Sequence, residues 1–284
     1  MQQRFSAEIC CHNPLVGYHF QSSKADRGVV VIAAAMGVEQ KFYFDFAQWL
    51  AEQGFEVLTF DYRGMGQSLR QPLAQVSITI SDWVQQDCVY MIDKAELLAQ
   101  GKPIYWLGHS LGGQVFAMIP NRHKVTQIIT VASGSGYWKT SDIKIKSVSL
   151  MLWFLVVPIA TRLVGYFPGK RLGIIGDLPY GVMRQWRQWC LNPDYLVGCE
   201  GNQVREQYHA LTLPITALAF QDDELINYAS VDKLHSFYQT AEKNHQYISP
   251  KEQNLEQIGH FGFFRSKHAQ TLWPAFITPI LECS

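Results

Sequence analysis

Short runs of apolar and β-branched residues alternate with longer amphipathic stretches from Gly28 onward. Residues 29–34 and 56–60 have the length and composition of strands, and the first run is apolar enough to be buried on both faces of a sheet. Between them, residues 42–51 have helical spacing, and the helix is predicted to end at Gly54. Strands that alternate with crossover helices are typical of a mostly parallel sheet flanked by helices, so the pattern predicts an α/β fold.

The same alternation continues to about residue 131. A helix is predicted over residues 81–100, with Ser81 as its N-cap and Gly101 at its end. Strands are then predicted over residues 104–107 and 125–131. The first half of the chain therefore accounts for most of the predicted sheet.

The alternation then stops, and the next clear strand is predicted at residues 215–220. A structureless loop of that length is uncommon in a compact domain, so we expect residues 138–210 to form a helical lid inserted into a single domain. Within it, residues 148–160 are strongly apolar, but they fall short of the roughly twenty residues that cross a bilayer, and Pro158 interrupts the helical pattern. A helix that is buried or covers a cleft is favoured over one that contacts a membrane surface.

Composition limits the partners of the protein. The 24 Lys and Arg residues balance 24 Asp and Glu residues, so the chain lacks the positive field that attracts nucleic acid. The N-terminal segment contains Glu8 and no continuous apolar stretch, which predicts a cytoplasmic protein without a signal peptide. The cysteines show no C-x-x-C spacing, so reduced thiols are expected in place of a metal site. They are Cys10, Cys11, Cys88, Cys190, Cys199 and Cys283.

A candidate nucleophile lies directly after the strand predicted at residues 104–107. Residues 108–113 read Gly-His-Ser-Leu-Gly-Gly, and an apolar helical stretch follows. A sharp turn from strand to helix exposes the serine, and it needs Gly108 and Gly112 because a Cβ there would collide with the backbone. Ser110 is therefore the predicted nucleophile, and a serine in this role needs a histidine base oriented by a third group.

The histidine base is expected late in the chain, after the acid. His260 lies in the sequence Gly-His-Phe-Gly, where the glycines suit a loop that bends the ring back over the sheet. His268 is the second choice, since it lies in a predicted terminal helix. His109 is adjacent to Ser110, but its side chain should point elsewhere, so we expect a packing role for it.

The acid is expected just after the strand at residues 215–220, where the chain reads Gln-Asp-Asp-Glu. Adjacent side chains point in different directions, so only one of Asp222 and Asp223 can orient His260. Local chemistry leaves both open.

Two backbone N–H groups should bind the oxyanion of an acyl-transfer reaction. One belongs to Leu111, directly after the nucleophile. The other is expected in the small-residue loop at residues 34–37, where Met36 is preferred and Ala35 or Gly37 remain possible.

Taken together, these residues resemble the α/β-hydrolase superfamily. Over almost the whole chain they look like a bacterial group of α/β hydrolases described as esterases or as serine peptidase-like. The matching motifs are Ala35-Met36-Gly37, the Asp-Tyr-Arg-Gly-Met-Gly-Gln-Ser run at residues 61–68, the 108–113 turn, Phe-Pro-Gly-Lys at residues 167–170, and Gly-His-Phe-Gly at residues 259–262.

The resemblance implies an α/β-hydrolase fold and a catalytic triad of Ser110, Asp223 and His260. It implies Met36 and Leu111 as oxyanion donors, and neither a metal nor another cofactor. One departure concerns the oxyanion loop, because the usual His-Gly pair of the superfamily is Ala34-Ala35 here.

The expected activity is hydrolysis of an ester, thioester or similar acyl bond of a small, hydrophobic molecule, through an acyl-enzyme on Ser110. Two alternatives remain open. An acyltransferase would use the same triad, and a non-catalytic binding or membrane-associated protein would retain only the fold.

Overall fold

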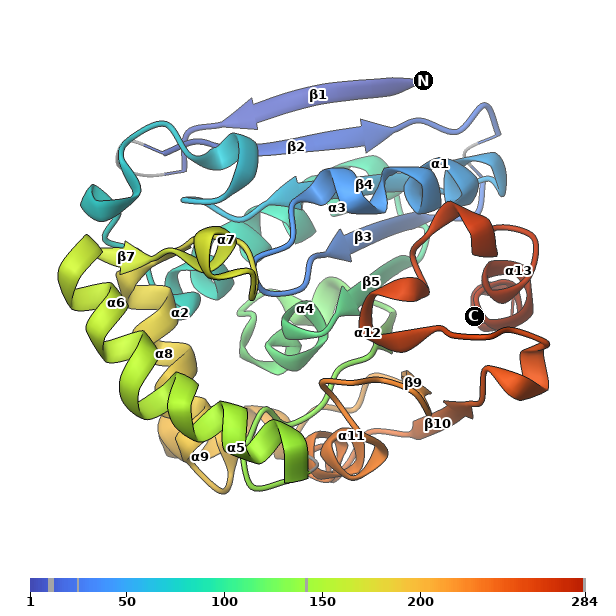
Figure 1. Ribbon diagram of the computed structural model, residues 1–284. Helices are drawn as coiled ribbons and strands as arrows, with labels where there is room; N and C mark the ends of the chain where they lie inside the picture. Colours follow the sequence, from blue (N-terminus) through green and yellow to red (C-terminus); the bar gives the residue numbers. More distant parts are fainter. Residues whose placement is uncertain (10–12, 25, 141–142, 283–284) are drawn as a thin grey trace.

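A central eight-stranded sheet runs through the computed structural model, which describes residues 1–9, 13–24, 26–140 and 143–282 (Figure 1). The strand order is β1-β2-β4-β3-β5-β6-β9-β10. The strands are β1 (Gln2–Ala7), β2 (Leu15–Phe20), β3 (Val29–Ala33), β4 (Glu56–Asp61), β5 (Ile104–His109), β6 (Gln127–Val131), β9 (Ile215–Phe220) and β10 (Lys243–Ile248). From β4 to β10 neighbouring strands are parallel, whereas β1 and β2 are antiparallel to their neighbours. The predicted mostly parallel sheet is confirmed.

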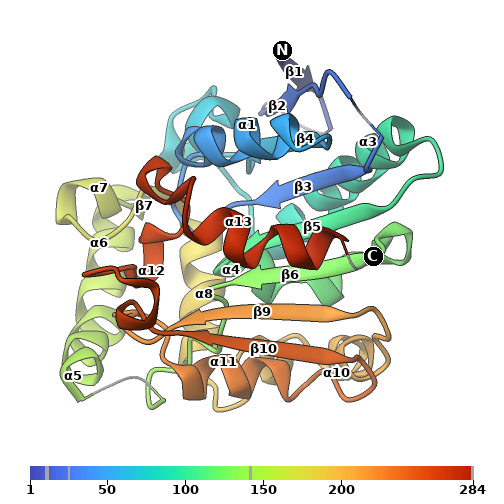
Figure 2. The ribbon, with the colours of Figure 1, turned by 90° about the vertical axis from the view of Figure 1, so that its right-hand side faces the viewer.

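Helices cover both faces of this sheet. Helix α1 (Phe44–Glu52) and helix α13 (Leu272–Phe276), near the end of the chain, lie on one face, and α3 (Val89–Ala99) lies on the other (Figures 1 and 2). Phe46 of α1 packs edge-on against Trp273 of α13, with ring centroids 5.1 Å apart. The apolar strands predicted from residues 29–34 and 56–60 therefore lie at the centre of the core.

The helix predicted over residues 81–100 begins differently from the prediction. It consists of α2 (Ile80–Asp82), a π-helical segment η4 (Trp83–Cys88) and α3. Its N-cap is Thr79, because the Thr79 hydroxyl accepts from the Asp82 amide and the Asp82 carboxylate accepts from the Thr79 amide. This reciprocal capping box, and not Ser81, starts the helix.

The chain between β6 and β9 is called the insertion below. It contains a short antiparallel pair, β7 (Tyr166–Phe167) with β8 (Leu178–Pro179), and a series of helical segments. These are α5 (Ile143–Met151), η7 (Leu152–Val156, a π-helix), α6 (Val157–Val164), α7 (Gly169–Leu172), α8 (Tyr180–Leu191), α9 (Tyr195–Cys199) and α10 (Asn202–His209). Figure 2 shows α5, α6 and α7 beyond the ends to which β3, β6 and β9 point. The helical character is as predicted, and a role as a lid stays a prediction.

The apolar run at residues 148–160 is buried on one side only. Trp153 and Val157 are buried, whereas Phe154, Leu155 and Ile159 are 56%, 54% and 49% exposed. The helix is therefore buried on one side, and its predicted role in covering a cleft stays a prediction. None of the helices in the described residues combines the length and the hydrophobicity of a transmembrane span.

Candidate active site

Ser110 lies at the sharp turn between β5 and α4 (Leu111–Gln114). Its backbone has φ 49° and ψ −113°, a conformation that costs a non-glycine residue about 1–3 kcal/mol. Hydrogen bonds hold the turn in place: the Ser110 amide donates to the Val131 carbonyl at 2.9 Å, and the Ser110 carbonyl accepts from the Gly113 and Gln114 amides at 3.0 Å each. The Ser133 hydroxyl donates to the same carbonyl at 2.9 Å. Strain is therefore stored at the predicted nucleophile.

The two glycines of the turn are needed for the reason that the sequence predicts. A Cβ on Gly108 would lie 2.3 Å from the Gly113 nitrogen, and a Cβ on Gly112 would lie 2.2 Å from the Ala33 carbonyl oxygen. Both distances are far inside van der Waals contact. The helix can therefore pack against β3 and β5 only because these side chains are absent.

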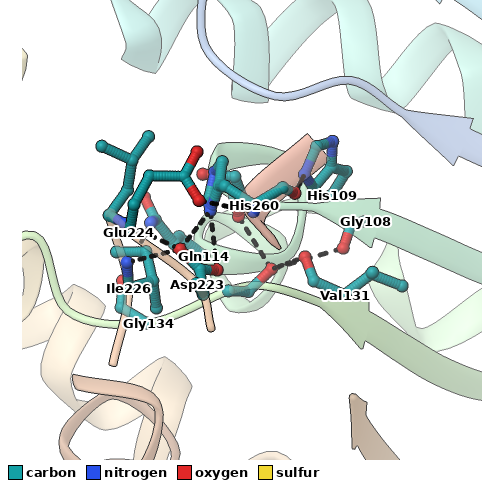
Figure 3. A network of polar contacts seen from close by, with 12 residues as sticks. Gly108, His109, Gln114, Val131, Gly134, Asp223, Glu224, Ile226 and His260 are labelled. Carbon is teal, nitrogen blue, oxygen red and sulfur yellow. Dashed lines mark hydrogen bonds and ion pairs between the residues drawn. The ribbon is translucent and has the colours of Figure 1, made fainter. Parts of the chain in front are cut away.

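Asp223 and His260 meet beyond the end of β9. His260 lies in α12 (Gly259–Gly262), and its Nδ1 is 2.8 Å from Oδ2 and 3.1 Å from Oδ1 of Asp223 (Figure 3). Both side chains are buried. A carboxylate on Nδ1 holds the proton there and leaves Nε2 as the basic nitrogen, the tautomer that a general base requires.

The acidic residues beside Asp223 hold the backbone of the same loop. Oδ2 of Asp222 accepts from the Ile258 amide at 2.8 Å, and Oε2 of Glu224 accepts from the His260 amide at 3.0 Å. Of the two aspartates left open by the sequence, Asp223 contacts the imidazole and Asp222 does not. The role of Glu224 was missed. In the sequence, the only indication of this role is that Glu224 directly follows Asp222 and Asp223, the two candidate partners of His260.

His109 is buried and packs against Phe261 and Phe264, as predicted, and it also forms hydrogen bonds that the sequence did not predict. Its Nε2 donates to the His260 carbonyl at 3.0 Å, and its Nδ1 accepts from the Tyr43 hydroxyl at 2.8 Å. The Tyr43 oxygen in turn accepts from the Ala35 amide at 2.9 Å. Burial, and then the nearby His260, lower the pKa of His109 well below its usual range, so the ring is neutral. One chain of hydrogen bonds thus joins the predicted oxyanion loop to the histidine loop.

The candidate oxyanion donors are the Leu111 amide and one amide of the loop at residues 34–37. Leu111 is the first residue of α4, so its amide has no acceptor within the helix. The Ala35 amide is already bound to the Tyr43 hydroxyl, which leaves Met36 and Gly37 as candidates in the early loop. Gly37 packs closely on the insertion, because a Cβ on it would lie 2.8 Å from the Gly176 nitrogen. Met36 as the second donor stays a prediction.

His268, the second choice for the base, has no such partner. Its ring is buried, and neither of its nitrogens forms a hydrogen bond with the part of the chain that the structure describes. Burial lowers its pKa. The geometry therefore favours His260.

A groove between the insertion and the core lies apart from Ser110, Asp223 and His260. It has a volume of about 1230 Å³ and runs between residues 74–81 and helices α6 and α8, and none of the three residues lines it. In the described ranges, no group of three His, Cys, Asp or Glu side chains is arranged to hold a metal ion.

Comparison with known proteins identifies the family. A sequence model of the family described as serine aminopeptidase, S33, matches residues 24–171, just over half of the chain. The protein belongs to the S33 serine aminopeptidase family. The chain is also 25% identical to the monoglyceride lipase of Saccharomyces cerevisiae over 217 residues, which cover 70% of this chain and 68% of the relative.

Solved structures agree with this S33 family assignment at the level of the fold. A soluble variant of the yeast monoglyceride lipase, in complex with a substrate analogue, aligns with a TM-score of 0.63 and 17% identity over 88% of this chain and 86% of that chain. A thermostable carboxyl esterase from Bacillus coagulans, in complex with glycerol, aligns with a TM-score of 0.58 and 12% identity over 87% and 90% of the two chains. The α/β-hydrolase fold is therefore confirmed.

The S33 family match includes the Ser110 turn but ends before the other two predicted triad residues. Assignment of Asp223 and His260 consequently depends on their geometry and on the motif at residues 259–262.

Proposed function

We propose that this S33 family member is a serine hydrolase that cleaves an ester, thioester or similar acyl bond of a small, hydrophobic molecule. Ser110 is the nucleophile, His260 the general base and Asp223 the residue that orients His260. The observation that carries the proposal is the buried contact of 2.8 Å between Asp223 and Nδ1 of His260, at the sheet edge where β5 turns at the strained Ser110. Strained serines and oriented histidines at one edge of a sheet are a typical arrangement for acyl transfer.

The reaction proceeds in two halves. Nε2 of His260 accepts the hydroxyl proton as Ser110 Oγ attacks the carbonyl carbon, and the Leu111 and Met36 amides stabilise the resulting oxyanion. The proton then passes to the leaving alkoxide or thiolate, and an acyl-enzyme remains. Water attacks this acyl-enzyme, with His260 as the base again, and the carboxylic acid is released while Ser110 regains its proton.

The relatives favour an ester as the scissile bond. The yeast relative is a monoglyceride lipase and the Bacillus relative a carboxyl esterase, and both names refer to ester cleavage. The family description refers to an aminopeptidase, so a peptide-like amide is the substrate to compare directly.

The experiment measures hydrolysis of p-nitrophenyl esters of increasing acyl length beside an amino acid p-nitroanilide. Ser110→Ala is compared with Ser236→Ala, a matched change at an exposed serine that forms the C-cap of α11 (Tyr228–His235). We expect ester hydrolysis that Ser110→Ala lowers by at least about a thousandfold and Ser236→Ala leaves unchanged. Faster cleavage of the anilide than of any ester would overturn the ester assignment. Ester hydrolysis that survives Ser110→Ala would overturn the mechanism.

A further inference from the structure

Exposed apolar side chains are concentrated on the insertion. Of the fifteen large apolar residues that the described part of the chain exposes, eleven lie between residues 148 and 180. Six of them, Val148, Met151, Phe154, Leu155, Ile159 and Leu163, follow one another along α5, η7 and α6 at helical spacing. We call these six residues the outer face. Contiguous apolar surface of this kind is unusual on a monomer and marks an interaction site.

The opposite side of the same helices is fixed to the protein. Trp153, Val157 and Thr161 are buried there at a spacing of four residues. The Trp153 ring contacts Trp186 of α8 edge-on, with centroids 5.2 Å apart, and the Arg187 side chain donates to the Trp153 carbonyl at 2.5 Å. The outer face is therefore held outward on a packed helix.

Basic residues predominate in the sequence that carries the outer face. Residues 143–176 contain no Asp or Glu and five basic residues, in a chain whose total charge is zero. These are Lys144, Lys146, Arg162, Lys170 and Arg171. Lys170 pairs with Glu39 at 3.0 Å, whereas Arg162 and Arg171 are exposed and form no ion pair within the described ranges. An apolar stripe with unbalanced basic residues fits a surface that is itself apolar and anionic.

We propose that the outer face docks on the surface of an anionic lipid bilayer. Leu155, Ile159 and their neighbours enter the boundary between headgroups and acyl chains, while Arg162 and Arg171 bind lipid phosphates. The helix lies along the membrane because its inner side stays packed on α8. A second copy of the chain fits this surface less well, since a symmetric contact would bring the two sets of basic residues against each other.

Docking in this orientation has a consequence for the site. Helices α5, α6 and α7 lie beyond the carboxyl ends of the parallel strands, the same end of the sheet at which Ser110 turns (Figure 2). The insertion would then lie between the bilayer and the sheet. The docking itself does not depend on the proposed hydrolase activity.

The test is flotation of the full chain with vesicles of phosphatidylcholine, and with vesicles of equal parts phosphatidylcholine and phosphatidylglycerol. One variant, Leu155→Ser with Ile159→Ser, removes apolar surface, and a second, Arg162→Gln with Arg171→Gln, removes charge. Leu97→Ser is the matched control, because Leu97 is 78% exposed on α3, away from the insertion. Thermal unfolding is followed in every variant as a check of folding, hydrolysis of a soluble ester is measured beside it, and flotation is repeated with Ser110→Ala.

We expect the wild type, Leu97→Ser and Ser110→Ala to bind the anionic vesicles equally. Both double variants should bind at least about tenfold more weakly, and raised salt should weaken wild-type binding. Equal binding by all variants, or no binding to anionic vesicles, would overturn the proposal. A concentration-dependent dimer that the Leu155→Ser, Ile159→Ser variant abolishes would assign the outer face to a second copy instead. Loss of ester hydrolysis alone, with flotation intact, would count only against the proposed activity.

Discussion

Replacing Asp223 by asparagine should reverse the tautomer of His260 with little change in structure. Oδ1 of Asp223 accepts the Leu225 and Ile226 amides at 2.8 Å each, so the asparagine oxygen must occupy that position. Its NH₂ group then takes the position of Oδ2, which is 2.8 Å from Nδ1 of His260. Nδ1 becomes a hydrogen-bond acceptor, the proton moves to Nε2, and the nitrogen that should accept the Ser110 proton is no longer available.

The size of the effect follows from two steps. If the asparagine side chain were flipped, its NH₂ group would face the Leu225 and Ile226 amides, which would cost roughly 2 kcal/mol or more. The orientation that places NH₂ against Nδ1 of His260 therefore dominates. A wrong tautomer in a serine protease triad lowers kcat by about 10⁴, which corresponds to about 5 kcal/mol of activation free energy. Asp222 and Glu224 still hold the loop, so the melting temperature should change little.

The assay is kcat/KM on a soluble p-nitrophenyl ester, measured beside thermal unfolding. Asp222→Asn is the matched control, because it changes an adjacent carboxylate that, among the described residues, accepts from the Ile258 amide and does not contact the imidazole. The control should retain nearly full activity. If Asp223→Asn lowered kcat/KM by less than about tenfold, or if Asp222→Asn were the more damaging change, Asp223 would not orient the base.

Three further changes test other parts of the structure. Tyr43→Phe leaves the Ala35 amide and Nδ1 of His109 without a partner and should cost about 2–4 kcal/mol in unfolding free energy by urea titration. Tyr62→Phe should cost much less, because the buried Tyr62 hydroxyl forms no hydrogen bond to a nitrogen or oxygen within the described residues. Gly112→Ala places a Cβ 2.2 Å from the Ala33 carbonyl oxygen and should lower thermal stability by about 3 kcal/mol, with loss of ester hydrolysis. Burial lowers the pKa of His235 to about 4, so the unfolded chain binds the extra proton first, and stability should fall by up to about 3 kcal/mol as pH drops from about 6.5 to 4. A His235→Gln variant with the same pH dependence of unfolding would contradict this.

The sequence predicts five of the six inner strands of the described sheet, β3, β4, β5, β6 and β9, because burial on both faces leaves a continuous apolar run. The inner strand β2 was missed, because Gly17 and His19 interrupt its apolar residues. The edge strands β1 and β10 carry polar side chains on their exposed positions and lack that signal, so they were missed. The sequence also could not predict which side of the helix at residues 148–160 forms the outer face, because this segment is apolar around the whole helix. Only the packing of Trp153 and Val157 shows which side faces inward.

The Ser110 turn is the part of the candidate site that the sequence predicts most directly. The Ser110 turn depends on local backbone geometry, which its glycines record in the sequence. The choice between Asp222 and Asp223 depends on how a turn directs two adjacent side chains, and the contacts of His109 depend on Tyr43, which is 66 residues away along the chain. Such long-range contacts leave no local pattern.

An activated serine at Ser110 is the central claim, and labelling with a fluorophosphonate followed by intact-mass analysis tests it most directly. The wild type should gain a single adduct on Ser110, and Ser110→Ala and His260→Ala should each gain none while remaining folded. A folded wild type that stays unlabelled, or an adduct that persists in Ser110→Ala, would contradict the proposed hydrolase mechanism.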